Sequence, residues 1–281
     1  MLVGMTSLTG QIAFVTGAAR GQGRSHALAL AREGADIAVC DIAQNISSVP
    51  YDLGTQEELD ETAQMVQAMG RKCISMTTDI RSTQSIEDAV AQTISNFGRI
   101  DILVANAGVC GFGEFSKITD EMWNDMIAVN LSGTFKTMRA VLPHMLERKY
   151  GRIIAVSSMS GRMGNANLAH YVATKWGIIG LAKSLASEVA GSNITVNALC
   201  PTSVDTPMLH NKAMYSLFCP DIEFPTKEDV MPRYAAMNKM GRPWLSSEEV
   251  SHALLYLCDE RAGAVSGQAV ELSLGSASGQ H

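Results

Sequence analysis

The residues best suited to chemistry are Tyr171 and Lys175, which lie four positions apart in a stretch, residues 168–190, that we expect to be helical. On a helix these two side chains project from the same face, one turn from each other. A phenol titrates near pH ~10 in water, but a fixed ammonium a few Å away favours the phenolate and lowers the pKa by roughly 1 to 3 units. The pair therefore predicts a tyrosine that can act as an acid and a base near neutral pH.

Ser158 follows the apolar run 153–156, so we expect it at the end of a strand, with its hydroxyl pointing to the same place. A hydroxyl there can hold an alcohol or carbonyl oxygen. A Tyr and a Lys four residues apart are also an ordinary pair on a helix surface, so the spacing alone is a weak motif. The chemistry needs support from the elements that would position these residues.

Composition narrows the class of protein. The chain has 281 residues, 46% of them hydrophobic, which suffices for one α/β domain with a large core. A formal charge of −6 without a run of Lys or Arg argues against a nucleic-acid surface. The six cysteines lack metal-ligand spacing, which favours reduced structural thiols and no metal site. With no signal-peptide pattern and no apolar run near the ~18 residues of a membrane span, we expect a soluble cytoplasmic protein that binds small molecules.

The first elements predict a βαβ unit, with strands at residues 12–15 and 37–40 and a helix at 22–32. The glycine loop between the first strand and the helix contains Gly17 and Gly21, which allow a tight turn, and Gly23, which lets helix and strand pack closely. The N-terminus of the helix offers free N–H groups and a favourable dipole to a pyrophosphate. The loop therefore predicts a dinucleotide site.

Asp41 stands at the end of the second strand. A carboxylate there can accept hydrogen bonds from both ribose hydroxyls of an adenosine and repels a 2′-phosphate, which favours NAD over NADP; the alternative is a strand-end acid in solvent. Residues 42–55 then form a loop of about fourteen residues, where roughly 2 to 6 are usual. This insertion either folds over the adenosine end of the cofactor or is a tolerated surface loop.

The remaining chain keeps alternating, with strands at 73–77, 100–105, 152–157, 194–199 and 268–272 and helices at 83–97, about 120–148 and 168–190. We predict one Rossmann-type domain over residues 1–281, a doubly wound parallel sheet of about seven strands with helices on both faces. Asp79 is then at the adenine edge or an N-cap. The segment 106–108 either approaches the cofactor closely or forms a turn. Asn130 lies in the middle of a predicted helix, where Asn is a poor helix former, so it indicates a functional role, a helix kink or a buried hydrogen bond.

These residues resemble the short-chain dehydrogenases/reductases over essentially the whole chain, in the motifs Thr16-Gly17-x-x-x-Gly21-x-Gly23, Asp79-Ile80, Asn106-Ala107-Gly108, Asn130, Ser158 and Tyr171-x-x-x-Lys175. The resemblance implies that Tyr171 exchanges the proton with a substrate oxygen that Ser158 holds. It implies that Lys175 binds the nicotinamide ribose and lowers the tyrosine pKa, while Asn130 holds a water of the proton relay. The implied NAD-binding residues are Gly17, Arg20, Gly21, Gln22, Gly23, Asp41, Ile42, Asp79, Ile80, Asn106, Ala107, Gly108, Tyr171, Lys175, Pro201, Thr202, Val204 and Thr206.

Two departures from the family pattern refine this interpretation. Thr202 follows Pro201 where the family usually has Pro-Gly, so the backbone there is less permissive. The long loop after Asp41, with the wording TGAARGQGRSHA, resembles the mycofactocin-associated, carveol-dehydrogenase-like subgroup. That similarity implies a tightly held NAD that an external electron carrier reoxidises, and the family resemblance implies a homotetramer. Two alternatives stay open: a conventional carbonyl reductase with exchangeable NAD(P)H, and a low-turnover dinucleotide-binding sensor.

Residues 202–244 are rich in methionine and aromatic side chains. Such adaptable apolar groups predict a lid over an apolar pocket, which would suit an apolar secondary alcohol or ketone. The alternative is that the same residues form core or subunit contacts. The side chains concerned are Met208, Leu209, Met214, Tyr215, Leu217, Phe218, Phe224, Met231, Tyr234, Met237, Met240 and Trp244.

Overall fold

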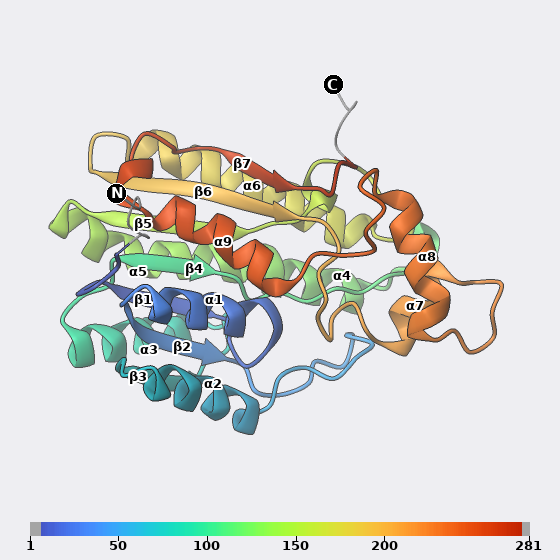
Figure 1. Cartoon of the computed structure of the whole chain (residues 1–281), viewed down its shortest axis with the longest axis horizontal. Coiled ribbons are helices and arrows are strands. Elements are labelled where there is room, and N and C mark those ends of the chain that lie inside the picture. Colours follow the sequence, from blue (N-terminus) through green and yellow to red (C-terminus); the bar gives the residue numbers. More distant parts are fainter. Residues whose placement is uncertain (1–6, 277–281) are drawn as a thin grey trace, which may run out of the picture.

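A seven-stranded sheet in the order β3-β2-β1-β4-β5-β6-β7 forms the centre of the computed structural model, which describes residues 7–276 (Figure 1). Every neighbouring pair of strands is parallel. The predicted fold class is therefore confirmed. The strands are β1 (Ile12–Thr16), β2 (Asp36–Asp41), β3 (Cys73–Thr77), β4 (Ile102–Ala105), β5 (Gly151–Val156), β6 (Ile194–Pro201) and β7 (Ala269–Leu272).

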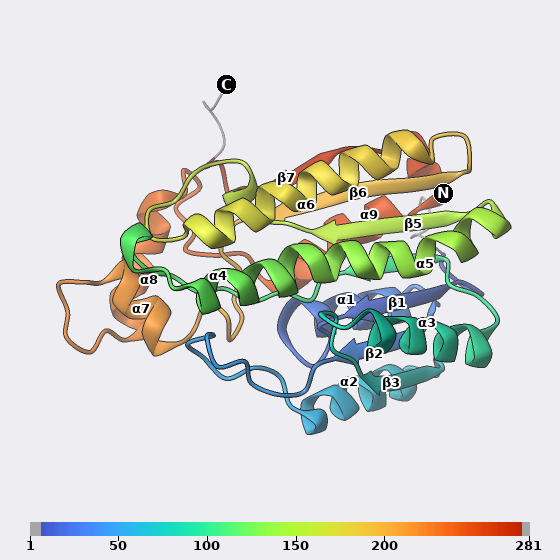
Figure 2. The same ribbon diagram turned by 180° about the vertical axis from the view of Figure 1, so that it is seen from behind.

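Helices cover both faces of the sheet. One face carries α1 (Gly21–Arg32), α2 (Gln56–Ala68) and α9 (Ser247–Cys258), which Figure 1 shows in front. The opposite face, seen in Figure 2, carries α3 (Thr83–Phe97), α4 (Asp120–Met126), α5 (Thr134–Arg148) and α6 (Ala169–Glu188). Beyond one end of the sheet lie two shorter helices, α7 (Lys212–Phe218) and α8 (Lys227–Met237), within the predicted lid segment.

Local sequence explains these elements. All residues of β4, β5 and β6 are buried, as expected for parallel strands that are covered on both faces and read as nearly continuous apolar runs. Several helices begin at a side-chain cap: Thr55 forms a capping box with Glu58 at α2, and Ser246 does the same with Glu249 at α9. Burial fixes the strands and capping fixes where the helices start.

The long helix predicted for residues 120–148 is interrupted. A π-helical segment, η2 (Ile127–Gly133), separates α4 from α5 and contains Asn130. The Asn130 side chain bonds the backbone of Val109 on both sides, with Nδ2 donating to the carbonyl and Oδ1 accepting from the amide, each at 2.8 Å. The helix irregularity and the buried hydrogen bond that were the plain alternatives for Asn130 are therefore both present.

Connections place the chemistry at one edge of the sheet. The order reverses between β1 and β4, the position where dinucleotides bind in such folds, and the glycine loop and Asn106 follow these two strands. The loop of residues 42–55 leaves β2 at the same edge, and the segment 202–244 leaves β6 there. No helix within residues 7–276 is long and apolar enough to cross a membrane. The predicted single domain also includes residues 1–6 and 277–281, which lie outside the described range.

Candidate active site

The end of β5 and the first turns of α6 hold the predicted catalytic side chains together. Lys175 Nζ donates to the carbonyl of Val156 at 2.9 Å, and Ser157 Oγ donates to the carbonyl of Lys175 at 2.8 Å. The same ammonium lies 5.5 Å from the ring centroid of Tyr171. Ser158 follows directly and its hydroxyl interacts with the Tyr171 phenol. These contacts bring a phenol, an ammonium and a hydroxyl into one place.

A cavity of about 390 Å³ contains this group. Ser158, Tyr171 and Lys175 line it, and so does every residue of the predicted NAD-binding set, from Gly17 in the glycine loop to Thr206 after β6. Its volume lies within the range of roughly 300 to 1,000 Å³ that is usual for cofactor and small-molecule sites. The described residues contain no group of three or more His, Cys, Asp or Glu that could hold a metal ion.

The pKa of one group in the cavity, the Tyr171 phenol, differs from the prediction. Burial raises the pKa of the Tyr171 phenol above its ordinary value, and the hydrogen bond with Ser158 only partly opposes this. Burial also lowers the pKa of Lys175 to about 8. The predicted lowering of the tyrosine pKa is therefore wrong for this structure, because the loss of hydration of the phenol is the larger effect.

Asn130 does not line the cavity. Besides Val109, its Nδ2 contacts Thr174 Oγ1 at 3.3 Å, and its side chain is fully buried. Gly108 separates it from the catalytic lysine: a Cβ on Gly108 would lie 3.2 Å from Asn130 Oδ1 and 3.6 Å from Lys175 Nζ. Asn130 thus adjoins the catalytic group from outside the cavity wall.

The glycine loop forms a cradle that side chains would fill. Gly17 has a φ of +66°, and a Cβ there would approach Ala107 Cα to 2.6 Å. A Cβ on Gly23 would lie 2.0 Å from the carbonyl oxygen of Gly17. Arg20, the N-cap of α1, makes no side-chain cap, so the first amides of this helix stay available to an anion. This donor set fits a pyrophosphate.

Asp41 and Asp79 line the cavity at the ends of β2 and β3, where the sequence predicts the adenosine. Asp41 Oδ2 accepts from the amide of Ala19 at 3.1 Å and Oδ1 from that of Ala43 at 3.3 Å, which leaves lone pairs for further donors. Burial raises the Asp41 pKa, although these amides oppose it. Asp79 pairs with Arg81 at 2.9 Å, while Ser82 caps α3, so the interpretation of Asp79 as the N-cap is wrong.

Residues 42–55 are tied across the cavity rather than left on the surface. Tyr51 Oη accepts from the amide of Cys110 at 3.0 Å, and both residues line the cavity. Ser47 Oγ donates to Glu121 Oε1 at 2.8 Å, and Ser48 Oγ to Asp125 Oδ2 at 2.7 Å, both on α4. The insertion therefore bridges the edge of the sheet from β2 to α4.

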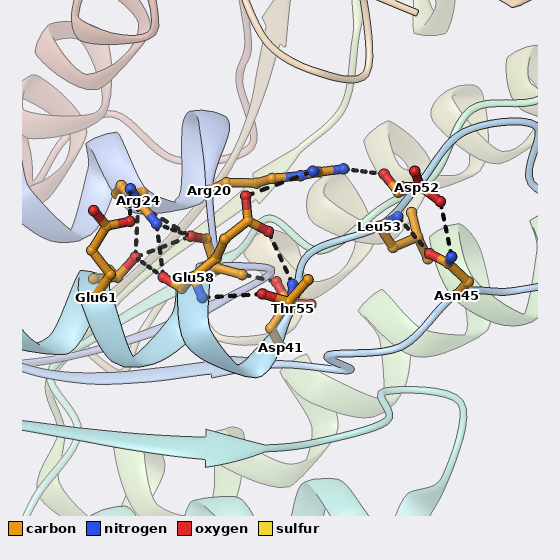
Figure 3. A network of polar contacts seen from close by, with 11 residues as sticks. Arg20, Arg24, Asp41, Asn45, Asp52, Leu53, Thr55, Glu58 and Glu61 are labelled. Atoms are coloured by element: carbon orange, nitrogen blue, oxygen red, sulfur yellow. Dashed lines mark hydrogen bonds and ion pairs between the residues drawn. The ribbon is translucent and has the colours of Figure 1, made fainter.

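The far end of the insertion is held by a second polar network (Figure 3). The Arg20 guanidinium reaches from the N-cap of α1 to the carbonyl of Asp52 and also pairs with Glu58 at 3.7 Å. Asn45 closes the loop on itself, with Nδ2 donating to Asp52 Oδ1 at 3.0 Å and Oδ1 accepting from the amide of Leu53 at 2.7 Å. Because polar contacts hold both ends of the insertion, they favour a loop that folds over the cofactor over a tolerated surface loop.

The lid segment contributes the apolar part of the cavity. Not every predicted lid side chain contributes: those of Phe224 and Met240 are exposed to solvent, at 81% and 67%. The predicted lid residues that line the cavity are Met208, Leu209, Met214, Phe218, Tyr234 and Met237.

Sequence reasoning missed several residues of the cavity wall. Tyr51 and Cys110 line the cavity and are hydrogen-bonded to each other, and Met163 and Leu168 belong to the segment between β5 and α6. The one available signal was Tyr51, the only aromatic residue of the loop 42–55.

Comparisons with known proteins agree with this geometry. A family model described as short chain dehydrogenase matches residues 11–215. The (−)-trans-carveol dehydrogenase of Rhodococcus erythropolis is 42% identical over 274 residues, which cover 97% of this chain and 99% of that one.

Two solved structures show the same fold. The crystal structure of carveol dehydrogenase from Mycobacterium avium in complex with NAD superposes with a TM-score of 0.95 at 39% identity, covering 97% of this chain and 99% of that chain. A short chain dehydrogenase from Mycobacterium paratuberculosis bound to NAD gives 0.87 at 32% identity, with 96% and 98% covered.

Proposed function

The chain belongs to the short-chain dehydrogenases, in the carveol-dehydrogenase-like group, and from this premise we propose that it oxidises or forms an apolar secondary alcohol with NAD as cofactor. The observation that carries the proposal is the meeting of Ser158, Tyr171 and Lys175 in the cavity that also contains the glycine cradle and Asp41. The NAD in the similar crystal structures and the apolar lid side chains support it.

NAD supplies the hydride acceptor or donor when it is bound, and the chain supplies the remaining chemistry. We propose that Ser158 holds the substrate oxygen and that Tyr171 Oη takes the proton of the alcohol, or returns it to a ketone. Because burial raises the tyrosine pKa, the phenolate requires the positive charge of Lys175 beside it. We propose that Asn130 would hold a relay water behind the cavity wall, one glycine away from the lysine ammonium, with the lone pair of Oδ1 that the Val109 amide leaves free.

We further propose that NAD is retained and that an external electron carrier of the mycofactocin type reoxidises it. The support is the insertion of residues 42–55, which is tied to α4, to the amide of Cys110 and to Arg20. A cofactor beneath it could leave only when several of these bonds open together. This arrangement supports a held cofactor over one that exchanges at every turnover.

Mass spectrometry and absorbance of the small molecule released by denaturing extensively dialysed protein test this proposal. Stoichiometric NAD or NADH is the expected result. Protein that is empty after dialysis and turns over added NAD or NADPH would instead be a conventional reductase with an exchangeable cofactor. A Tyr171→Phe variant whose activity equals that of the wild type would indicate a dinucleotide-binding sensor.

Subunit contacts and location complete the proposal. Phe135 on α5 and Trp176 on α6 are exposed at 43% and 50%, and Figure 2 shows that these two helices lie side by side. Exposed aromatic side chains on neighbouring helices support burial in a homotetramer, which sedimentation analysis tests, since a monomer would refute it.

All six cysteines are free, which supports a reducing cytoplasm; recovery in a secreted fraction would contradict that location.

A further inference from the structure

Tyr234 on α8 carries a hydroxyl that the fold does not use. The residue has no exposed surface, and its ring packs against Phe218 at 4.3 Å and Trp244 at 6.0 Å between centroids. Among the described residues, Tyr234 Oη has no hydrogen-bond partner. A buried hydroxyl without a partner destabilises a fold relative to the phenylalanine that would fill the same space, so its presence calls for another explanation.

The other tyrosines around the lid and the insertion have partners. Tyr215 Oη lies 2.8 Å from His210 Nδ1, and Tyr51 Oη accepts from Cys110. Tyr215 does not line the cavity, whereas Tyr234 does. Tyr234 is therefore a tyrosine of the cavity wall whose hydroxyl has no hydrogen-bond partner among the described residues.

Its surroundings place Tyr234 in an apolar part of the cavity wall. Tyr234 belongs to a buried apolar cluster that includes Cys110 and Met214, and Tyr171 packs against the same cluster. A molecule whose reacting oxygen lies at Tyr171 would extend its body into this apolar region. The hydrocarbon part would contact the lid, and one atom of that part would come near Tyr234.

We propose that Tyr234 Oη binds a second oxygen of the substrate and thereby selects apolar secondary alcohols or ketones that carry a further hydroxyl, carbonyl or ether group remote from the reacting carbon. A phenol can both donate and accept, so each of these groups can serve as its partner. This inference rests on the proposed alcohol dehydrogenase function and names the substrate class of that site.

The approach to the hydroxyl requires the lid to adapt. Water cannot reach Tyr234 Oη in the described structure, but Met214 and Met237 line the cavity beside it. Methionine side chains are unbranched and turn easily, and lid helices commonly shift when a substrate binds. A substrate oxygen therefore reaches the phenol by displacing thioether chains rather than by breaking hydrogen bonds.

The test uses Tyr234→Phe and two substrates of nearly equal shape, trans-4-methoxycyclohexanol and trans-4-ethylcyclohexanol, which differ by an oxygen in place of a methylene. The assay is oxidation by the NAD-loaded enzyme, with a redox dye as electron acceptor. We expect wild-type kcat/KM to favour the methoxy compound by about tenfold, and Tyr234→Phe to lose this preference while it keeps its rate on the ethyl compound. Its melting temperature should be unchanged or higher.

Tyr215→Phe is the matched control, because it removes a lid hydroxyl that has its own partner and does not line the cavity. It should keep the methoxy preference. A preference that survives in Tyr234→Phe, or is absent from the wild type, overturns the inference. A lower melting temperature of Tyr234→Phe also overturns it, because the hydroxyl would then serve the fold. A wild type that oxidises neither alcohol refutes the proposed function as well, whereas oxidation without the expected preference refutes only the role of Tyr234.

Discussion

Removing one hydroxyl from the insertion should loosen the cofactor. In Tyr51→Phe the amide of Cys110 loses the oxygen that accepts its hydrogen bond at 3.0 Å, while the ring keeps its packing. A buried donor left without a partner costs roughly 1–3 kcal/mol. If this free energy destabilises only the closed conformation of residues 42–55, the fraction of molecules with an open loop rises by about 5- to 150-fold, since each 1.4 kcal/mol is a factor of ten. The NAD dissociation rate should rise by the same factor.

The assay is the release of radiolabelled NAD into an excess of unlabelled NAD. Ser47→Ala is the control, because it removes an exposed bond to Glu121 that water can replace, and we expect less than about a threefold effect. Melting temperatures of both variants show whether the fold is intact. A dissociation rate of Tyr51→Phe equal to that of the wild type, in protein with unchanged stability, would refute the idea that this bond holds the cover closed.

Three further predictions concern residues that line the cavity. Tyr171→Phe should lower turnover by a factor on the order of 10³ while bound NAD remains stoichiometric, checked by steady-state rates and cofactor content. Asp41→Ala should reduce the preference for NAD over NADP by roughly tenfold, measured as the ratio of the two affinities. The pKa of Lys175 is lowered by burial from 10.5 to about 8, so between these pH values the unfolded chain binds more protons than the folded one. The free energy of unfolding of NAD-free protein should therefore rise with pH across that window, and urea titrations should show that Lys175→Met lacks this rise.

Local patterns were sufficient to predict most of the fold. The strand predicted at residues 73–77 and the helix at 83–97 have the same bounds in the structure. Both depend on nearby residues, through apolar side chains on the strand and the Ser82 cap on the helix. The predicted cofactor residues lie together in one cavity because parallel strands bring their carboxyl ends to one edge, which follows from the alternation of elements alone.

Features set by distant contacts could not be predicted in this way. The π-helical segment contains Asn130, whose side chain is bonded to Val109, 21 residues away, and no local periodicity encodes that bond. The raised pKa of Tyr171 depends on how deeply the phenol is buried. Part of that burial comes from the cluster that contains Met214 and Tyr234, which we call the lid cluster and which lies mostly in the last third of the chain. The spacing of Tyr171 and Lys175 indicated which groups meet, but it contained no information on how much water they lose.

Cys110 links the two covers of the cavity. Its backbone amide holds Tyr51 of the insertion, and its side chain is buried in the lid cluster with Tyr234, against which Tyr171 packs. A shift of this residue therefore acts on the cofactor cover and on the substrate end at once. Because a packed interior does not deform continuously, a displacement of Cys110 would disturb its contacts with the insertion and with the lid residues together. The proposed retention of NAD and the proposed substrate contact at Tyr234 would then share one support, and we expect a bound substrate to slow the release of NAD in the exchange assay.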